Sequence, residues 1–274
     1  MKVGFLQTSP LFGKKDENLD KVTVTIQSLN ADLLVLPELC NTGYQFISRE
    51  EVLALAESVP EGQTTRALVK LSKEKGMYLV AGLAERENGR CYNSSILVGP
   101  HGFIGCYRKL HLFSHEKQWF EPGNRDLEVY DIEKAKVGIM ICFDWFFPEV
   151  ARHLAVKGAD IICHPANLVL PYCPQAMITR CIENRVFAIT ANRIGTEARS
   201  EEALTFIGTS QIVGIKGDVL CRASSDRDEA VIVEIDPKIA RDKNVTPMNH
   251  LLNDRRFQIM SLLTPGKEEF KKIV

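Results

Sequence analysis

Residues 137–149 read Val-Gly-Ile-Met-Ile-Cys-Phe-Asp-Trp-Phe-Phe-Pro-Glu, an apolar run that leads into a cysteine and then a proline. The run from Lys136 to Cys142 predicts a strand buried on both faces. Pro148 suits the first turn of a helix, which we expect over 148–157. A thiol at such a strand end lies near helix N–H groups, which lower its pKa and can bind an oxyanion. Cys142 is therefore a candidate nucleophile, although any one buried cysteine is more often a small core residue.

Two more predicted strands lead into a reactive side chain. Residues 32–36 are almost all apolar and lead to Glu38, whose carboxyl we expect to be partly desolvated and suited to general-base work. A strand over 103–108 runs into Lys109, and the alternation of Arg108 and Lys109 predicts that one faces a site and the other faces solvent. Ligands bind at the carboxyl ends of strands in open α/β sheets, so a base, a cation and a thiol would meet there. This set is complete for acyl transfer through a thioester.

The rest of the chain alternates predicted strands and helices without a linker-like segment, which indicates one α/β domain with mixed strand order. We expect this domain to cover residues 1–240. Residues 241–274 are too few to build a core, so we expect a C-terminal tail that packs on the domain or on a partner subunit. Further strands are expected over 3–7, 78–81, 95–98, 161–164, 187–191, 211–215 and 230–235, the last two paired with each other, and further helices over 14–29, 64–75 and 175–186.

The composition is that of a soluble globular protein and argues against several functions. Of 274 residues, 34 are basic and 35 acidic, and a net charge of −1 argues against nucleic acid or an anionic membrane as an obligate partner. No apolar run approaches the roughly 18 residues of a membrane span, and the first residues lack a signal-peptide pattern, so a cytoplasmic protein is expected. The sequence has no Gly-rich phosphate loop, and its Cys and His residues lack metal-ligand spacing, so we expect neither a cofactor nor a metal.

Three motifs occur in order along the chain, with four shorter supporting ones. The motifs are Leu36-Pro37-Glu38-Leu39 with Asn41-Thr42-Gly43-Tyr44, Arg108-Lys109-Leu110-His111-Leu112-Phe113, and Gly138-Ile139-Met140-Ile141-Cys142-Phe143-Asp144 with Pro148-Glu149; the supporting ones are Phe120-Glu121-Pro122-Gly123, Lys157-Gly158-Ala159, His164-Pro165-Ala166-Asn167 and Glu183-Asn184-Arg185. With them the chain resembles the nitrilase, or carbon–nitrogen hydrolase, superfamily over essentially its whole length, and is most similar to small archaeal-type nitrilases and N-carbamoyl amine amidohydrolases. The resemblance implies a four-layer α-β-β-α sandwich with mixed sheets.

The resemblance also implies a role for individual residues. Glu38 is the expected general base, Lys109 the stabilising cation and Cys142 the nucleophile. Glu116 matches a second glutamate that positions substrate. The backbone N–H of Phe143 is expected to hold the developing negative charge together with Lys109. The reaction would release ammonia and leave a thioester for water to hydrolyse.

The residues after Asp144 bear on the substrate. Relatives that act on amide or carbamoyl groups of α-amino acids often carry Arg there, whereas residues 145–147 are Trp, Phe and Phe. If these aromatic side chains face the site rather than the core, they favour apolar or cationic substrates. We therefore expect a small amide, carbamoyl amine or nitrile without an α-carboxylate, unless Arg180, Arg193 or Arg199 supplies a cation. Trp145 and Asn167 are the candidate substrate contacts.

Two other functions use the same residues. The thioester can pass its acyl group to an amine or another acceptor, which makes the chain an acyltransferase. The chain can also be a non-catalytic scaffold, which the intact set of Glu38, Lys109 and Cys142 argues against.

A homodimer or a higher even oligomer is expected, because the resemblance implies pairing that extends the layers across a dimer. The helices over 148–157 and 175–186 and the tail beyond Pro237 are expected at the interface. The tail contains apolar side chains that need burial, namely Ile239, Val245, Met248, Leu251, Leu252 and Phe257.

Overall fold

The strand that precedes Glu38 lies in the middle of a six-stranded sheet in the computed structural model, which describes residues 1–256. β2 (Leu33–Val35) pairs in parallel with β1 (Lys2–Gln7) and with β3 (Tyr78–Glu87). The outer strands are antiparallel to their neighbours, so the sheet is mixed. They are β4 (Arg90–Gly99), β5 (Gly102–Arg108) and β14 (Glu229–Glu234), and the order is β14-β1-β2-β3-β4-β5.

The strand that precedes Cys142 lies in a second six-stranded sheet. β7 (Lys136–Ile139), β8 (Ile161–Pro165) and β9 (Phe187–Ala191) are parallel to one another at its centre. Antiparallel strands complete both edges, so this sheet is mixed as well. They are β6 (Val129–Asp131), β12 (Gln211–Val213) and β13 (Val219–Arg222), and the order is β13-β12-β9-β8-β7-β6.

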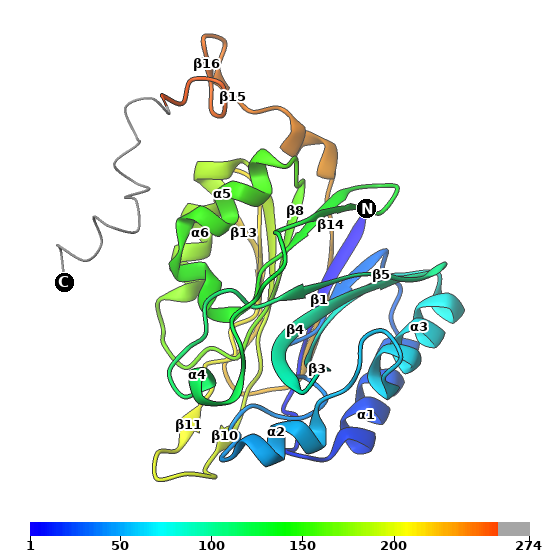
Figure 1. Cartoon of the computed structure of the whole chain (residues 1–274). Coiled ribbons are helices and arrows are strands. Elements are labelled where there is room, and N and C mark those ends of the chain that lie inside the picture. The colour runs from blue at the N-terminus through cyan, green and yellow to red at the C-terminus, as the bar shows by residue number, and fades with distance from the viewer. Residues whose placement is uncertain (257–274) are drawn as a thin grey trace, which may run out of the picture. The chain divides into compact units, whose positions relative to one another are not determined.

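The two sheets face each other, and helices cover their outer sides. Figure 1 shows α1 (Lys15–Gln27) and α3 (Gln63–Lys75) outside the first sheet, and α5 (Pro148–Val156) and α6 (Cys173–Asn184) outside the second. Between the sheets, β2 and β3 contact β8. The expected four-layer α-β-β-α sandwich is confirmed. Shorter elements connect the layers: α2 (Arg49–Leu55), α4 (Glu116–Trp119), the 3₁₀ helices η1 (Cys142–Phe146) and η2 (Pro237–Arg241), and the strands β10 (Thr196–Glu197) and β11 (Leu204–Thr205).

The all-apolar sequence of β2 follows from its place between two cores. Leu33 and Val35 point between the sheets and pack in the cluster that holds Ile139 of β7. Leu34 points the other way and packs with Ile26 of α1 and with α3. Alternate side chains of a strand leave opposite faces, so a strand covered on both faces is apolar at every position.

The predicted pairing of residues 211–215 with 230–235 is wrong. β12 instead turns at Gly217, whose φ of 87° is in the left-handed region, and pairs with β13 on one side and β9 on the other. β14 pairs with β1 in the other sheet. β13 is short and mostly exposed, so its sequence carries no apolar pattern that would predict a strand.

The structure separates into a compact unit, Met1–Arg241, and a second unit that begins at Asp242. The described part of the second unit contains an antiparallel hairpin of β15 (Asn244–Thr246) and β16 (Asn249–His250). The tail packing expected for residues 241–274 stays a prediction, and Phe257 lies outside the described residues.

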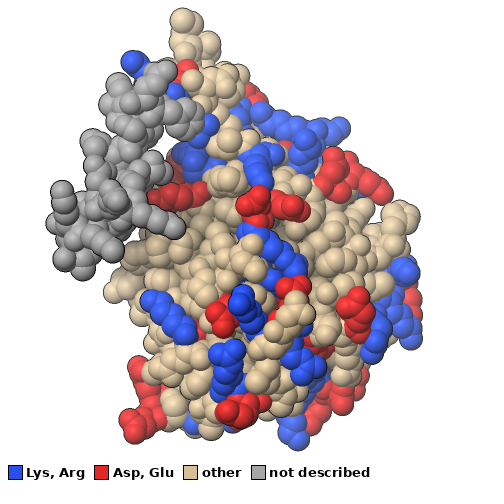
Figure 2. Space-filling view, in the orientation of Figure 1, with Lys and Arg blue, Asp and Glu red and all other residues tan. Residues whose placement is uncertain are grey.

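The surface carries charges of both signs. Figure 2 shows basic side chains interspersed with acidic ones over the displayed face, in keeping with the net charge of −1. Among residues 1–256, no helix has both the length and the apolar character that crossing a membrane requires.

Candidate active site

Glu38 follows β2 on a segment that stays alongside β3. The Leu36 N–H donates to the Val80 carbonyl at 2.8 Å, and the Cys40 N–H donates to the Gly82 carbonyl at 3.0 Å. A Cβ at position 82 would overlap the Glu38 Cα, so only glycine permits this close approach. The Glu38 side chain is completely buried, which goes further than the partial desolvation expected from its place after an apolar strand.

Lys109 follows the last residue of β5. Its N–H donates to the Asn93 carbonyl, and its own carbonyl accepts from the Gly123 N–H, both at 2.8 Å. A Cβ on Gly123 would overlap the Arg108 carbonyl oxygen, which explains the glycine of the Phe-Glu-Pro-Gly motif. The lysine side chain is thereby held in the interior.

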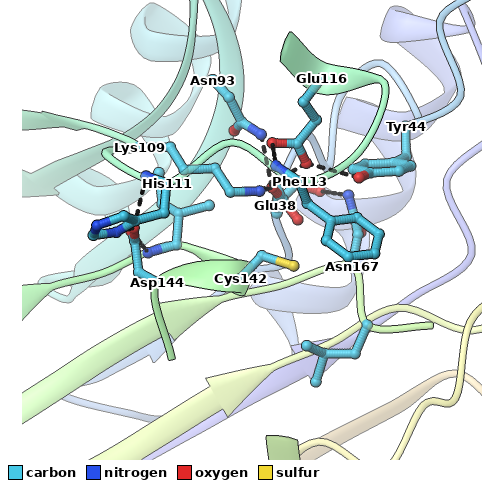
Figure 3. A network of polar contacts seen from close by, with 12 residues as sticks. Glu38, Tyr44, Asn93, Lys109, His111, Phe113, Glu116, Cys142, Asp144 and Asn167 are labelled. Carbon is cyan, nitrogen blue, oxygen red and sulfur yellow. Dashed lines mark hydrogen bonds and ion pairs between the residues drawn. The ribbon is translucent and has the colours of Figure 1, made fainter. Parts of the chain in front are cut away.

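Cys142 lies on a sharp turn rather than in a strand. β7 ends at Ile139, three residues before the predicted end, and Cys142 begins η1 with a φ of 40°. This left-handed backbone conformation is rare outside glycine and is maintained only where the surroundings enforce it. The turn directs the thiol to the end of the sheet, where Figure 3 shows it near the side chains of Glu38 and Lys109.

The Lys109 ammonium lies between two carboxylates. Its Nζ donates to Glu38 Oε1 at 2.6 Å and to Glu116 Oε1 at 2.7 Å. The same Glu38 oxygen accepts from Asn93 Nδ2, and the same Glu116 oxygen accepts from the Tyr44 hydroxyl, both at 2.7 Å. Figure 3 shows these side chains converging from separate parts of the chain. Glu38, Lys109 and Glu116, named from the sequence, thus lie in direct contact.

Burial and neighbouring charges set the ionisation of the cluster. Burial raises the pKa of the Glu38 carboxyl to about 7, against the opposing effect of the Lys109 ammonium. Burial lowers the pKa of Lys109, but the carboxylates of Glu116 and Glu38 outweigh it and raise that pKa above its usual value. The cation therefore stays charged.

The pKa of the Cys142 thiol is raised, contrary to the expectation that helix N–H groups lower it. Burial is the largest cause and the negative charge of Glu38 adds to it, while the Lys109 ammonium and the backbone N–H of Asn167 act in the opposite direction. The thiol is therefore protonated at neutral pH. A nucleophile of this kind needs an adjacent base.

Asp144 ties the turn at Cys142 to the segment that follows Lys109. Its Oδ2 accepts from the Ile141 N–H at 2.9 Å and from the Tyr107 hydroxyl at 2.7 Å. Its Oδ1 accepts from the His111 N–H at 3.1 Å and lies 2.8 Å from His111 Nδ1, and that ring stacks on Phe147. These contacts support a structural role for His111.

Two cavities adjoin the cluster. The larger, about 380 Å³, has Tyr44 and Glu116 in its wall, and the smaller, about 20 Å³, has Cys142 and Phe143. Phe113, Val169 and Leu170 line both, so the cavities adjoin. Among the described residues that line them, none is Lys or Arg.

The three aromatic side chains of residues 145–147 lie in different surroundings. Trp145 is buried and lines the smaller cavity together with Asn167. Phe146 is 53% exposed, and Phe147 stacks on His111. Asn167 also donates from Nδ2 to the Glu38 carbonyl at 2.9 Å, so it fixes the backbone of the base.

The prediction that Arg108 or Lys109 faces solvent is wrong, because both are buried. Arg108 forms a two-pronged ion pair with Glu85, at 2.9 and 2.5 Å. The three arginines considered for substrate binding are each paired with a glutamate: Arg180 with Glu183, Arg193 with Glu197 and Arg199 with Glu51.

Three further residues belong to this network without being among the predicted site residues. Tyr44 stands in a quoted motif, and Asp144 stands two residues after the candidate nucleophile. Asn93 is the first of three consecutive buried polar residues of β4, Asn93-Ser94-Ser95, and buried polar side chains in a strand are the signal that points to it. Within residues 1–256, no group of three or more His, Cys, Asp or Glu side chains is arranged to hold a metal ion.

Comparison with known proteins places this geometry in context. The profile of the family described as Carbon-nitrogen hydrolase matches residues 2–244. A nitrilase of Pyrococcus abyssi is 48% identical over 259 residues, covering 93% of this chain and 97% of that protein. An (R)-stereoselective amidase of a Pseudomonas species is 34% identical over 241 residues, covering 86% of this chain and 85% of that protein.

A solved structure agrees with the fold. The crystal structure of a carbon–nitrogen hydrolase from Helicobacter pylori superposes with a TM-score of 0.87 at 26% identity, covering 96% of this chain and 98% of that chain. The region matched by the family profile contains both six-stranded sheets and all four of Glu38, Lys109, Glu116 and Cys142.

Proposed function

The chain belongs to the carbon–nitrogen hydrolase family, and from that membership we propose that Cys142, Glu38 and Lys109 are the catalytic residues with which it hydrolyses its substrate. One observation carries the proposal. Glu38 Oε1 is engaged by Lys109 and Asn93, whereas the buried Oε2 has no hydrogen-bond partner among residues 1–256. A buried carboxylate oxygen without a hydrogen-bond partner, near the protonated Cys142 thiol, is suited to accept a proton.

The first half-reaction forms a thioester. Glu38 takes the Cys142 proton, and the thiolate attacks the carbonyl or nitrile carbon. Two of the three N–H donors of Lys109 are engaged by Glu38 and Glu116, which leaves one for the substrate oxygen or nitrogen. The Phe143 backbone N–H is the second donor to the developing charge. With an amide or carbamoyl substrate, Glu38 then passes its proton to the departing nitrogen as the C–N bond breaks. With a nitrile, the proton goes to the nitrogen of a thioimidate, and a water molecule adds to the carbon before ammonia leaves and the thioester forms.

The second half-reaction returns the enzyme to its starting state. Glu38 removes a proton from water, the hydroxide attacks the thioester carbon, and the Cys142 sulfur leaves with the proton held by Glu38. One carboxyl therefore serves as base and then as acid in each half. A pKa of about 7 suits both tasks near neutral pH.

The cavity linings support a substrate without a carboxylate near the reacting group. Their described residues include Glu116 and Glu202 but no Lys or Arg. A carboxylate buried there would lack a charged partner, which costs several kcal/mol. We therefore propose a small amide, carbamoyl amine or nitrile as substrate.

Ammonia release tests the reaction. Wild-type protein is incubated with a panel of aliphatic amides, carbamoyl amines and small nitriles, and we expect release from at least one class. Cys142→Ala should abolish it, whereas Cys221→Ala, which removes a half-buried thiol from an edge strand, should retain it. Turnover by Cys142→Ala would contradict the assignment. Products that form only with an added amine acceptor would favour acyl transfer.

The substrate class has its own test. We expect kcat/KM to be at least about 10-fold higher for a carbamoyl amine than for the N-carbamoyl amino acid that bears one additional carboxylate. A clear preference for the acid would contradict the proposed class. Loss of that preference on substituting Arg180, Arg193 or Arg199 would identify the missing cation.

We also propose that the protein acts in a reducing compartment such as the cytoplasm. All eight cysteines are unpaired, and seven of them are buried. Disulfides form and persist mainly in oxidising compartments, so this pattern supports the proposal.

A further inference from the structure

The backbone carbonyl of Cys142 has a side-chain partner that the mechanism does not use. His164 Nε2 lies 2.9 Å from this carbonyl oxygen, and His164 Nδ1 lies 3.1 Å from Thr190 Oγ1. A carbonyl oxygen only accepts, so Nε2 carries the hydrogen and Nδ1 accepts from the threonine hydroxyl. Burial lowers the pKa of His164 to about 4, so the ring is neutral near pH 7.

The peptide unit held by His164 is the one that contains the Phe143 N–H. The carbonyl of Cys142 and the N–H of Phe143 belong to one planar amide, so a contact that orients one end orients the other. A hydrogen bond accepted by the carbonyl also polarises the amide and strengthens its N–H as a donor.

The surroundings make His164 a rigid support. It lies on β8, and Thr190 is its register partner on the parallel neighbour β9. Both side chains are buried. If the Cys142–Phe143 peptide rotated, the carbonyl and the imidazole N–H would lose their partner inside the protein, and leaving buried polar groups unpaired is unfavourable.

We propose that His164 is a positioning residue for the oxyanion site: it aligns and polarises the Cys142–Phe143 peptide so that the Phe143 N–H binds the negative charge of the tetrahedral intermediate. The inference rests on the proposed function, which makes that N–H an oxyanion donor. Its distinguishing consequence is that His164 matters when negative charge develops on the substrate, and not for the reactivity of the thiol itself.

A matched pair of variants tests this. His164→Gln keeps an N–H donor at about the position of Nε2, and His164→Met has the same length without a donor. We expect kcat for amide hydrolysis to fall about 10- to 100-fold in His164→Met, towards the loss seen when an oxyanion donor is removed. His164→Gln should stay within about 5-fold of wild type.

Thiol reactivity provides the second readout, measured in a Cys221→Ala background to suppress labelling at the half-buried cysteine. Methyl methanethiosulfonate reacts with the Cys142 thiolate at sulfur, releasing methanesulfinate, so no oxyanion forms on a carbonyl. Its rate should agree within about 3-fold among wild type and both variants. Equal turnover in the two variants would overturn the inference, as would a parallel loss of turnover and labelling in His164→Met. Absence of turnover in wild type, or turnover in Cys142→Ala, would instead contradict the proposed function.

Discussion

Glu38 is the residue whose ionisation we expect to govern activity below neutral pH. Burial raises the pKa of its carboxyl to about 7, and the negative charge of Glu116 contributes to the rise. A general base must be ionised in the free enzyme, so kcat/KM should fall about 10-fold per pH unit below about 7 and level off above it. Measuring the profile with an uncharged amide avoids titration of the substrate.

A variant tests whether the ionisation of Glu38 causes the bend of the pH profile near pH 7. Glu116→Gln removes a charge that raises the pKa of Glu38, so the residual activity should have its inflection at lower pH than in wild type. A profile that is flat between pH 5 and pH 8 in wild type would contradict the role of Glu38.

Arg108 illustrates a buried ion pair next to the site. Its side chain and that of Glu85 are each 1% exposed, so the Arg108→Met variant leaves a buried carboxylate without its main partner. We expect the free energy of unfolding to fall by about 3–5 kcal/mol. Urea unfolding of Arg108→Met and of the double variant Arg108→Met/Glu85→Gln measures this, and the double variant should recover part of the loss. Equal losses in both would contradict the charge argument.

At the scale of elements, the β10–β11 hairpin is fastened to the segment that carries Tyr44. Glu197 of β10 accepts from the backbone N–H of Tyr44 at 3.1 and 3.2 Å and from that of Gln45 at 2.5 Å. The Tyr44 hydroxyl in turn donates to Glu116 in the site. An element distant in the sequence thereby helps to hold the charge cluster.

A substitution at Glu197 tests this connection. Glu197→Gln weakens the hold on Tyr44 and leaves the buried Arg193 without its carboxylate partner. We expect kcat/KM to fall about 10-fold and the free energy of unfolding to fall by about 3 kcal/mol or more. Glu201→Gln, an exposed position between the same two strands, is the control and should change neither. Unchanged kinetics in Glu197→Gln would show that the site does not depend on the hairpin.

At the scale of the whole molecule, we propose a homodimer formed through the outer face of α5 and α6. Val156 of α5 and Ile182 of α6 are 47% and 51% exposed, and these two helices contact each other. Apolar side chains exposed on adjacent helices are typical of a surface that a partner covers.

Light scattering at micromolar concentration tests the assembly. We expect twice the 30.8 kDa of the chain for wild type and a shift towards one chain for Ile182→Lys, because a buried lysine would lack a partner. Val24→Lys makes the same change at a 68% exposed position on α1 and should leave the mass unchanged. A wild-type monomer would contradict the proposal.

Local sequence patterns were sufficient to predict the main strands and the partial desolvation of Glu38. A strand covered on both faces must be apolar throughout, and the three consecutive apolar residues Leu33-Leu34-Val35 show this pattern. Gly76, which directly follows the last residue of α3, likewise marks the helix end, where its φ is 64°. Both features depend only on residues that are close together in the sequence, so they can be recognised without a structure.

The contacts that only the tertiary structure decided join segments far apart in the sequence. Nothing near Arg108 specifies that Glu85 will neutralise it, nothing near Tyr44 specifies its bond to Glu116, and nothing in residues 229–234 specifies pairing with β1 rather than with β12. Residue types and their periodicity determine that a side chain is buried and what chemistry it can perform. Which group it meets is decided by the packing of two sheets that bring separate strand ends together, because partners that share no local pattern are selected only by the fold as a whole.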